Sequence, residues 1–163
     1  MKITFQGNPL TLLDKQVAVG EKAPYFTAVN LDLSDYKYES SDKIKVISVV
    51  PSLDTPVCSL QTTKFNMSLE ELEGVEIITV STDLPFAQAR FCQEEDVKNL
   101  TVVSDYKYKD FSKKYGCLIE ELQILTRAVF VVDKDNTVKY VDYLEEITNE
   151  PNYEKALEVV KSL

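Results

Sequence analysis

Cysteine offers the strongest nucleophile in this 163-residue chain, which has three of them: Cys58, Cys92 and Cys117. Cys58 follows a Thr55-Pro56 pair, which is typical of an N-cap with proline at the first helical position. Unpaired backbone N–H groups and the positive end of the helix dipole favour a thiolate in such a first turn, and the Thr55 hydroxyl would be a close donor. The sequence therefore predicts a reactive Cys58; the alternative is a small buried apolar side chain.

A thiolate at this position needs a permanent cation for further activation, because the chain has no histidine. That absence excludes Cys-His and Ser-His-Asp hydrolases and almost every kind of zinc site. Of the two arginines, Arg90 and Arg127, the second precedes a strand predicted over residues 128–132. Its guanidinium would then emerge at a strand end, where it could orient a thiolate and an oxygen ligand together. From position alone, a solvated arginine is the favoured alternative.

The other two cysteines are weaker candidates. Cys92 lies well along a second predicted helix, and a disulfide with Cys58 requires the two Cα atoms to lie within about 7 Å. Two helical cysteines would have to unwind in part to meet, so a buried apolar role for Cys92 stays open. Cys117 follows the helix-ending Gly116 and is expected to be structural. The spacing contains no CxxC motif and no metal-ligand cluster, so we expect neither a general disulfide reductase nor a metal site.

The elements that must position these side chains alternate between buried strands and helices. We predict strands over residues 44–50, 75–80, 100–103, 128–132 and 137–143, with shorter ones near 26–29 and 36–39. Helices are predicted over residues 56–74, 85–94 and 109–115 and from residue 153, and a β-hairpin over 2–13. This order predicts an α/β protein of thioredoxin-like fold, with a central mixed, mainly parallel sheet flanked by helices and an N-terminal β-hairpin extension.

Composition limits the class of protein further. A net charge of −9 makes nucleic acid and anionic lipid surfaces poor partners. The N-terminus lacks the pattern of an export signal, and the longest apolar run, residues 128–132, is too short to cross a bilayer. We expect a single domain over residues 1–163 in the cytoplasm, where sparse thiols stay reduced.

Several segments together resemble the bacterial thiol peroxidases, which are atypical two-cysteine peroxiredoxins of the thioredoxin-like superfamily. Residues 51–58, with 64–66, resemble their peroxidatic loop, and residues 81–92 resemble their resolving-cysteine helix. Residues 126–133 are similar to their arginine strand, and both chain ends, at residues 5–9 and 142–153, fit as well. The resemblance covers essentially the whole chain.

The resemblance implies a role for each candidate residue. Cys58 would be the peroxidatic cysteine, which attacks the peroxide O–O bond and becomes a sulfenic acid. Thr55 and Arg127 would hold the thiolate and the peroxide oxygens, and Pro51 would shield the pocket from water. Cys92 would resolve the sulfenic acid as a disulfide within one chain, and thioredoxin would reduce that disulfide.

The resemblance also implies hydrogen peroxide and organic hydroperoxides as substrates, a homodimer, and no bound cofactor. It gives Cys117 no role. Because Cys58 must react within a helix and then reach Cys92, we expect local unwinding around both cysteines on oxidation. Two alternatives remain: a one-cysteine peroxidase in which Cys92 is structural, and a peroxide sensor or binding module that signals through oxidised Cys58.

Overall fold

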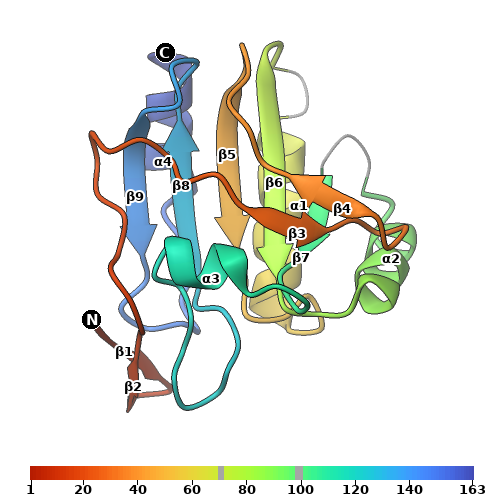
Figure 1. Cartoon of the computed structure of the whole chain (residues 1–163), viewed down its shortest axis with the longest axis vertical. Helices are drawn as coiled ribbons and strands as arrows, with labels where there is room; N and C mark the ends of the chain where they lie inside the picture. The colour runs from red at the N-terminus through yellow and green to blue at the C-terminus, as the bar shows by residue number, and fades with distance from the viewer. Residues whose placement is uncertain (70–71, 98–100) are drawn as a thin grey trace.

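The computed structural model describes residues 1–69, 72–97 and 101–163 (Figure 1). Its strands are β1 (Lys2–Phe5), β2 (Asn8–Thr11), β3 (Thr27–Val29), β4 (Asp35–Lys37), β5 (Ile44–Val49), β6 (Val75–Ser81), β7 (Thr101–Ser104), β8 (Ala128–Val132) and β9 (Val138–Tyr143). Its helices are α1 (Pro56–Leu69), α2 (Pro85–Glu94), α3 (Asp110–Lys114) and α4 (Tyr153–Lys161). The predicted order of strands and helices is confirmed.

Within the described residues, one sheet contains seven strands in the order β4-β3-β7-β6-β5-β8-β9. The pairs β5–β6 and β6–β7 are parallel, and the other four neighbouring pairs are antiparallel. The mixed sheet is confirmed, but only the two central pairs are parallel, so the prediction of a mainly parallel sheet is wrong. Parallel neighbours need a long crossover, which α1 and α2 provide, whereas β3–β4 and β8–β9 are joined by short turns that enforce antiparallel pairing.

Both faces of the sheet are covered by apolar packing. All six residues of β5 are buried, and alternate side chains point to opposite faces. Ile47 and Val49 pack toward α3 in one cluster, while Ile44 and Val46 pack toward α1 and α4 in another. Figure 1 shows α3 in front of the sheet and α1 and α4 behind it.

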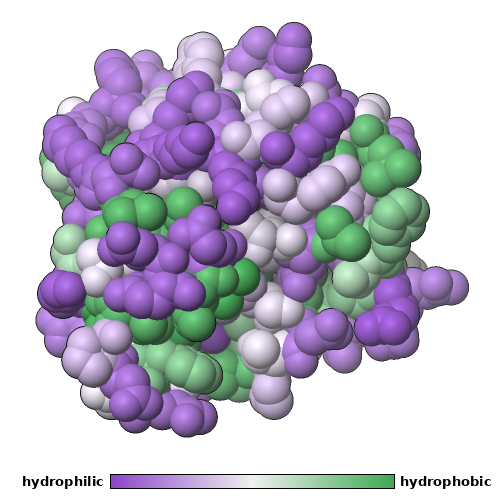
Figure 2. Space-filling view, turned by 60° about the horizontal axis from the view of Figure 1, so that its bottom comes forward, coloured by the Kyte–Doolittle hydropathy of each residue, from purple (hydrophilic) through white to green (hydrophobic). Residues whose placement is uncertain are grey.

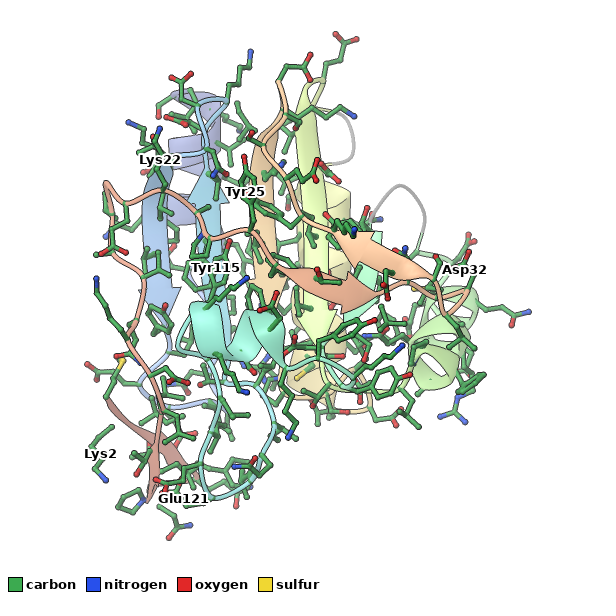
Figure 3. The ribbon with its side chains drawn as sticks, viewed as in Figure 1. Lys2, Lys22, Tyr25, Asp32, Tyr115 and Glu121 are labelled. Carbon is green, nitrogen blue, oxygen red and sulfur yellow. The ribbon has the colours of Figure 1, made fainter. Side chains whose placement is uncertain are left out.

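The N-terminal hairpin is a separate two-stranded sheet at one end of the molecule, as predicted. Its turn uses positive φ angles at Gln6 and Gly7, of 50° and 81°, which suits a two-residue hairpin turn. Figure 3 labels Lys2 and Glu121 on either side of it; the Lys2 ammonium donates to the Thr11 hydroxyl, and the Glu121 carboxylate accepts from the Thr11 N–H. The hairpin is therefore anchored to the segment between α3 and β8.

One boundary differs from the predictions, and a second falls outside the described residues. The structure describes α1 as far as Leu69, and residues 70 and 71 lie outside the described residues. The helix was predicted to run to Gly74, but Gly74 has a φ of 74° and forms the turn into β6. Such a φ is incompatible with a continuing helix. Leu100, predicted to begin a strand, lies outside the described residues, and β7 begins at Thr101.

In the described part of the chain, no helix has the length and apolar character that a membrane span requires.

Candidate active site

Cys58 is the third residue of α1, and its side chain is fully buried. The Thr55 hydroxyl accepts a hydrogen bond from the Cys58 N–H at 3.4 Å, which confirms Thr55 as the cap. The hydroxyl has one proton, and it donates that proton to the Ser52 carbonyl at 3.0 Å. The expected donation from this hydroxyl to the sulfur is therefore absent in this form of the protein, because the proton closes the turn before α1.

Arg127 lies immediately before β8, and only 3% of its surface is exposed. Its guanidinium donates from Nε to the Ile147 carbonyl at 2.7 Å, from Nη1 to Gln61 Oε1 at 2.9 Å, and from Nη2 to Cys58 Sγ at 3.2 Å. The alternative of a solvated arginine is wrong. The fixed fork geometry of the guanidinium lets one residue meet all three acceptors at once.

Gln61 was missed by the sequence reasoning, although it orients Arg127. It lies one turn after Cys58 on α1, is fully buried, and donates through Nε2 to the Ser48 hydroxyl at 2.8 Å. Residues three apart share a helix face, so a glutamine at this spacing on a buried face was the available signal. The Ile147 carbonyl carried no signal, because any residue type supplies that group.

The contacts of Arg127 determine what the site can do. Two of its three acceptors, the Gln61 amide and the Ile147 carbonyl, are neutral. A thiolate at Cys58 would thus supply the negative charge on this contact set. Because water is excluded from the buried sulfur, the attraction between guanidinium and thiolate is screened far less than at a surface.

A cavity of about 330 Å³ opens beside this contact. Its lining residues are Phe5, Gln6, Pro51, Ser52, Thr55, Pro56, Val57, Leu122, Ile124, Arg127, Ile147 and Thr148. Apolar side chains dominate this lining, and Pro51 is buried while Thr55 is exposed. Figure 2 turns this end of the molecule forward and shows apolar residues gathered on the side of the hairpin and, separately, over α2.

Cys92 lies on α2 and is half-buried. It packs against the apolar cluster that contains Cys58, Leu53 and Phe91, so the two cysteines share one cluster. Both are free thiols, and burial raises the pKa of Cys92. The sequence left open whether Cys58 and Cys92 lie close together, and their shared cluster places them in the same part of the core.

Cys117 lies in the other core, among the residues that pack between α3 and the sheet. It is fully buried, with its sulfur 3.6 Å from the Tyr115 carbonyl oxygen; Tyr115 is labelled in Figure 3. Burial raises the pKa of Cys117 well above its ordinary value, and the Asp105 carboxylate adds to this effect. These surroundings agree with a structural role. Within the described residues, no group of three His, Cys, Asp or Glu side chains could hold a metal ion.

Comparison with known proteins gives consistent relatives over nearly the full chain. Residues 18–157 match the Redoxin family model. The chain is 51% identical to a thiol peroxidase of Halalkalibacterium halodurans, covering 98% of this chain and 97% of that one, and 44% identical to a thiol peroxidase of Clostridium acetobutylicum, covering 99% of each.

Solved structures agree with the sequence relatives. A peroxiredoxin-like protein from Aquifex aeolicus superposes with a TM-score of 0.93 at 45% identity, covering 99% of this chain and 96% of that one. A thiol peroxidase from Chromobacterium violaceum, with a TM-score of 0.90 at 22% identity, covers 99% and 95% and supports the fold. The predicted thioredoxin-like fold is confirmed. The chain therefore belongs to the Redoxin family and, within it, to the thiol peroxidases, which are peroxiredoxin-type enzymes.

Proposed function

We propose that this chain is a two-cysteine thiol peroxidase in which Cys58 is the nucleophile toward the peroxide. One observation carries the proposal: Arg127 Nη2 lies 3.2 Å from Cys58 Sγ in a fully buried pair next to a cavity. A permanent cation against a sulfur is the arrangement that favours the thiolate.

In the first step the Cys58 thiolate attacks one peroxide oxygen, and the O–O bond breaks. The sulfur is oxidised to a sulfenic acid, and the second oxygen takes a proton and leaves as an alcohol or as water. Arg127 would stabilise the charge on the sulfur and on the departing oxygen. Thr55 at the cavity wall would orient the peroxide, and buried Pro51 would keep water away from the sulfur.

The lining of the cavity favours alkyl hydroperoxides as substrates in addition to hydrogen peroxide. Its walls include Phe5, Leu122 and Ile124, which would contact an alkyl chain and not a second hydroxyl. Arg127 and Thr55 both line the cavity and both hydrogen-bond to Cys58, so the O–O group would sit next to them.

In the second step the Cys92 thiol attacks the sulfenic acid, the S–S bond forms, and water leaves. Cys58 sits within α1 and Cys92 within α2, so we expect residues 55–60 and 86–93 to unwind when the disulfide forms. Hydrogen exchange in these two segments should rise on oxidation. Unchanged exchange in both would contradict this motion.

A dithiol reductant must close the cycle, and we propose thioredoxin, which would reduce the disulfide by thiol exchange in the cytoplasm. The resemblance further implies a homodimer, which sedimentation equilibrium of the reduced protein would test. We assign no cofactor to the reaction, since sulfur and peroxide carry all of the chemistry.

Peptide mapping under non-reducing conditions tests this proposal. Fully reduced protein receives one equivalent of peroxide, and we expect a Cys58–Cys92 disulfide within one monomer while Cys117 stays free. A Cys58→Ser variant should give no oxidation product. An unmodified Cys58 in the wild type would overturn the proposal.

A one-cysteine peroxidase is the second candidate, favoured by the packing of Cys92 into an apolar cluster, which raises its pKa. A Cys92→Ser variant separates the two: only the two-cysteine enzyme would lose turnover linked to thioredoxin.

A sensor or binding module would instead turn over slowly and hold a long-lived oxidised state that changes its binding to a partner.

A further inference from the structure

Asp83 connects the two segments that lead into the cysteine-bearing helices. Its carboxylate accepts from the Ser52 hydroxyl at 2.7 Å and from the Leu53 N–H at 2.7 Å, both just before α1. The same carboxylate accepts from the Ser81 hydroxyl at 2.8 Å, at the end of β6. Asp83 itself lies two residues before Pro85, the first residue of α2.

On the Cys58 side, these bonds hold the turn that caps α1. Ser52 provides the carbonyl that accepts from the Thr55 hydroxyl, and that hydroxyl accepts from the Cys58 N–H. Leu53 is buried in the same apolar cluster as Cys58. Asp83 therefore holds in place Ser52, which is hydrogen-bonded to the cap of α1, and Leu53, which packs in the cluster of the reactive sulfur.

On the Cys92 side, the route runs through Gln88, which is fully buried on α2. Its Nε2 donates to the Ser81 hydroxyl at 3.0 Å and to the Val103 carbonyl at 2.9 Å. Gln88 precedes Cys92 by four residues, so the two lie on the same face of α2. The Ser81 hydroxyl thus joins Asp83 to the helix of Cys92.

The sequence pattern around Asp83 predicts only a helix start. Leu84, and not Asp83, is the N-cap of α2, and its side chain forms no capping hydrogen bond. Its carboxylate instead reaches across to residues 30 and 31 positions earlier in the chain. This is an inter-segment contact rather than a local turn.

We propose that Asp83 is a positioning residue that acts as a latch: its hydrogen bonds to Ser52 and Leu53 set the balance between the closed form, which reacts with peroxide, and the opened form, in which the Cys58–Cys92 disulfide forms. The inference rests on the proposed two-cysteine function. The latch must break whenever the two segments move independently, because it spans them.

Two fates of the Cys58 sulfenic acid report on the latch. In the closed form a second peroxide can oxidise it to a sulfinic acid, with an alcohol or water as the other product. In the opened form the Cys92 thiol displaces water from it and forms the disulfide. Weakening the latch therefore lowers the share of sulfinic acid, and it also slows the first oxidation because the Arg127 contact is populated less.

Asp83→Ala removes the latch, and Asp83→Asn keeps its size while retaining one acceptor oxygen. Asp54→Asn is the matched control, since Asp54 also lies just before α1 and reaches α2, through an exposed ion pair of 3.6 Å with Arg90. Exposed pairs contribute little, so this control should behave as the wild type. It makes the same carboxylate-to-amide change as Asp83→Asn.

Each variant is treated with a series of peroxide concentrations, and mass spectrometry gives the ratio of sulfinic Cys58 to Cys58–Cys92 disulfide. The loss of hydrogen bonds to a carboxylate should raise the peroxide concentration that gives half sulfinic acid about tenfold in Asp83→Ala. We expect a smaller rise in Asp83→Asn and none in Asp54→Asn. Hydrogen exchange at residues 53–60 should increase in the reduced Asp83 variants alone.

Two results overturn the latch. If the wild type forms the disulfide but both Asp83 variants keep its product ratio, the latch is wrong while the proposed function stands. If the Asp83 variants merely unfold more easily and keep that ratio, Asp83 is structural only. A wild type that forms no Cys58–Cys92 bridge would instead remove the proposed function, and the latch with it.

Discussion

Cys58 and Cys117 are both fully buried, yet their surroundings are opposite in charge. Cys58 accepts a hydrogen bond from the Arg127 guanidinium, whereas Cys117 lies against the Tyr115 carbonyl and feels the negative charge of Asp105. Burial alone disfavours a thiolate at either position. The two cysteines therefore differ in the sign of the neighbouring charge and not in their exposure to solvent.

The two regions also differ in what lies next to the sulfur. The Cys58 region borders a cavity of about 330 Å³, while Cys117 lies within the packed core formed by α3 and the sheet. A reactive thiol needs both a compensating cation and space for its substrate. Substitutions at Arg127 and Gln61 remove the cation or one of its anchors while the apolar walls of the cavity stay in place.

Arg127→Ala should have the largest effect. Loss of the cation removes the main difference between the two thiols, and we expect the rate of Cys58 oxidation to fall roughly 100- to 1,000-fold. Arg127→Lys keeps the charge but not the fork, so it should recover only part of the rate. Rapid-quench oxidation followed by thiol labelling measures this; a rate in Arg127→Ala within threefold of the wild type would break the comparison.

Gln61→Met should have an intermediate effect. It keeps the volume of the side chain but removes the acceptor for Arg127 Nη1, so the guanidinium loses one of its three anchors. We expect the oxidation rate of Cys58 to fall about tenfold, the value of one hydrogen bond to a charged group. The same quench assay applies, and labelling of Cys117 in denaturant provides the internal standard.

Glu146→Gln tests, through the pH dependence of stability, a carboxylate that holds the segment next to the site. Glu146 precedes Ile147, whose carbonyl accepts from Arg127. Hydrogen bonds from the Thr148 hydroxyl, the Gly7 N–H and the Thr148 N–H lower the pKa of Glu146 from 4.5 to about 2. A depressed pKa means that the carboxylate stabilises the fold above pH 4.5 and that this contribution disappears as the pH falls toward 2. The variant should therefore have the lower Tm at pH 7, and the two Tm values should converge near pH 2; a constant difference would contradict the assignment.

Cys117→Ala should have the smallest effect on chemistry. Peroxide kinetics should stay within twofold of the wild type, because the Cys117 sulfur lies against the Tyr115 carbonyl and Cys117 does not line the cavity beside Cys58. The small void left in the core should lower the free energy of unfolding by about 1 kcal/mol, which denaturant titration measures. Loss of peroxidase turnover in this variant would show that the two regions are coupled.

Much of the fold could be predicted because its signals are local. The buried run of β5, the Thr55-Pro56 helix start and the apolar face of α4 each depend on neighbours in sequence. The antiparallel pairing of β3 with β7 and of β8 with β5 could not be predicted, since it depends on how distant segments meet. The same limit applies to the site: Cys58 and Thr55 carry local signals, whereas the bonds of Gln61 and Asp83 cross between elements.

The hairpin of β1 and β2 precedes residue 18, where the match to the shared Redoxin core begins. It nevertheless supports that core at the site: the Thr4 carbonyl accepts from the Ile147 N–H, and the Ile147 carbonyl in turn accepts from Arg127. The chain's first strand is thus two hydrogen bonds away from the guanidinium at the sulfur. A fusion partner or affinity tag appended at this end would therefore alter the scaffold of the reaction centre.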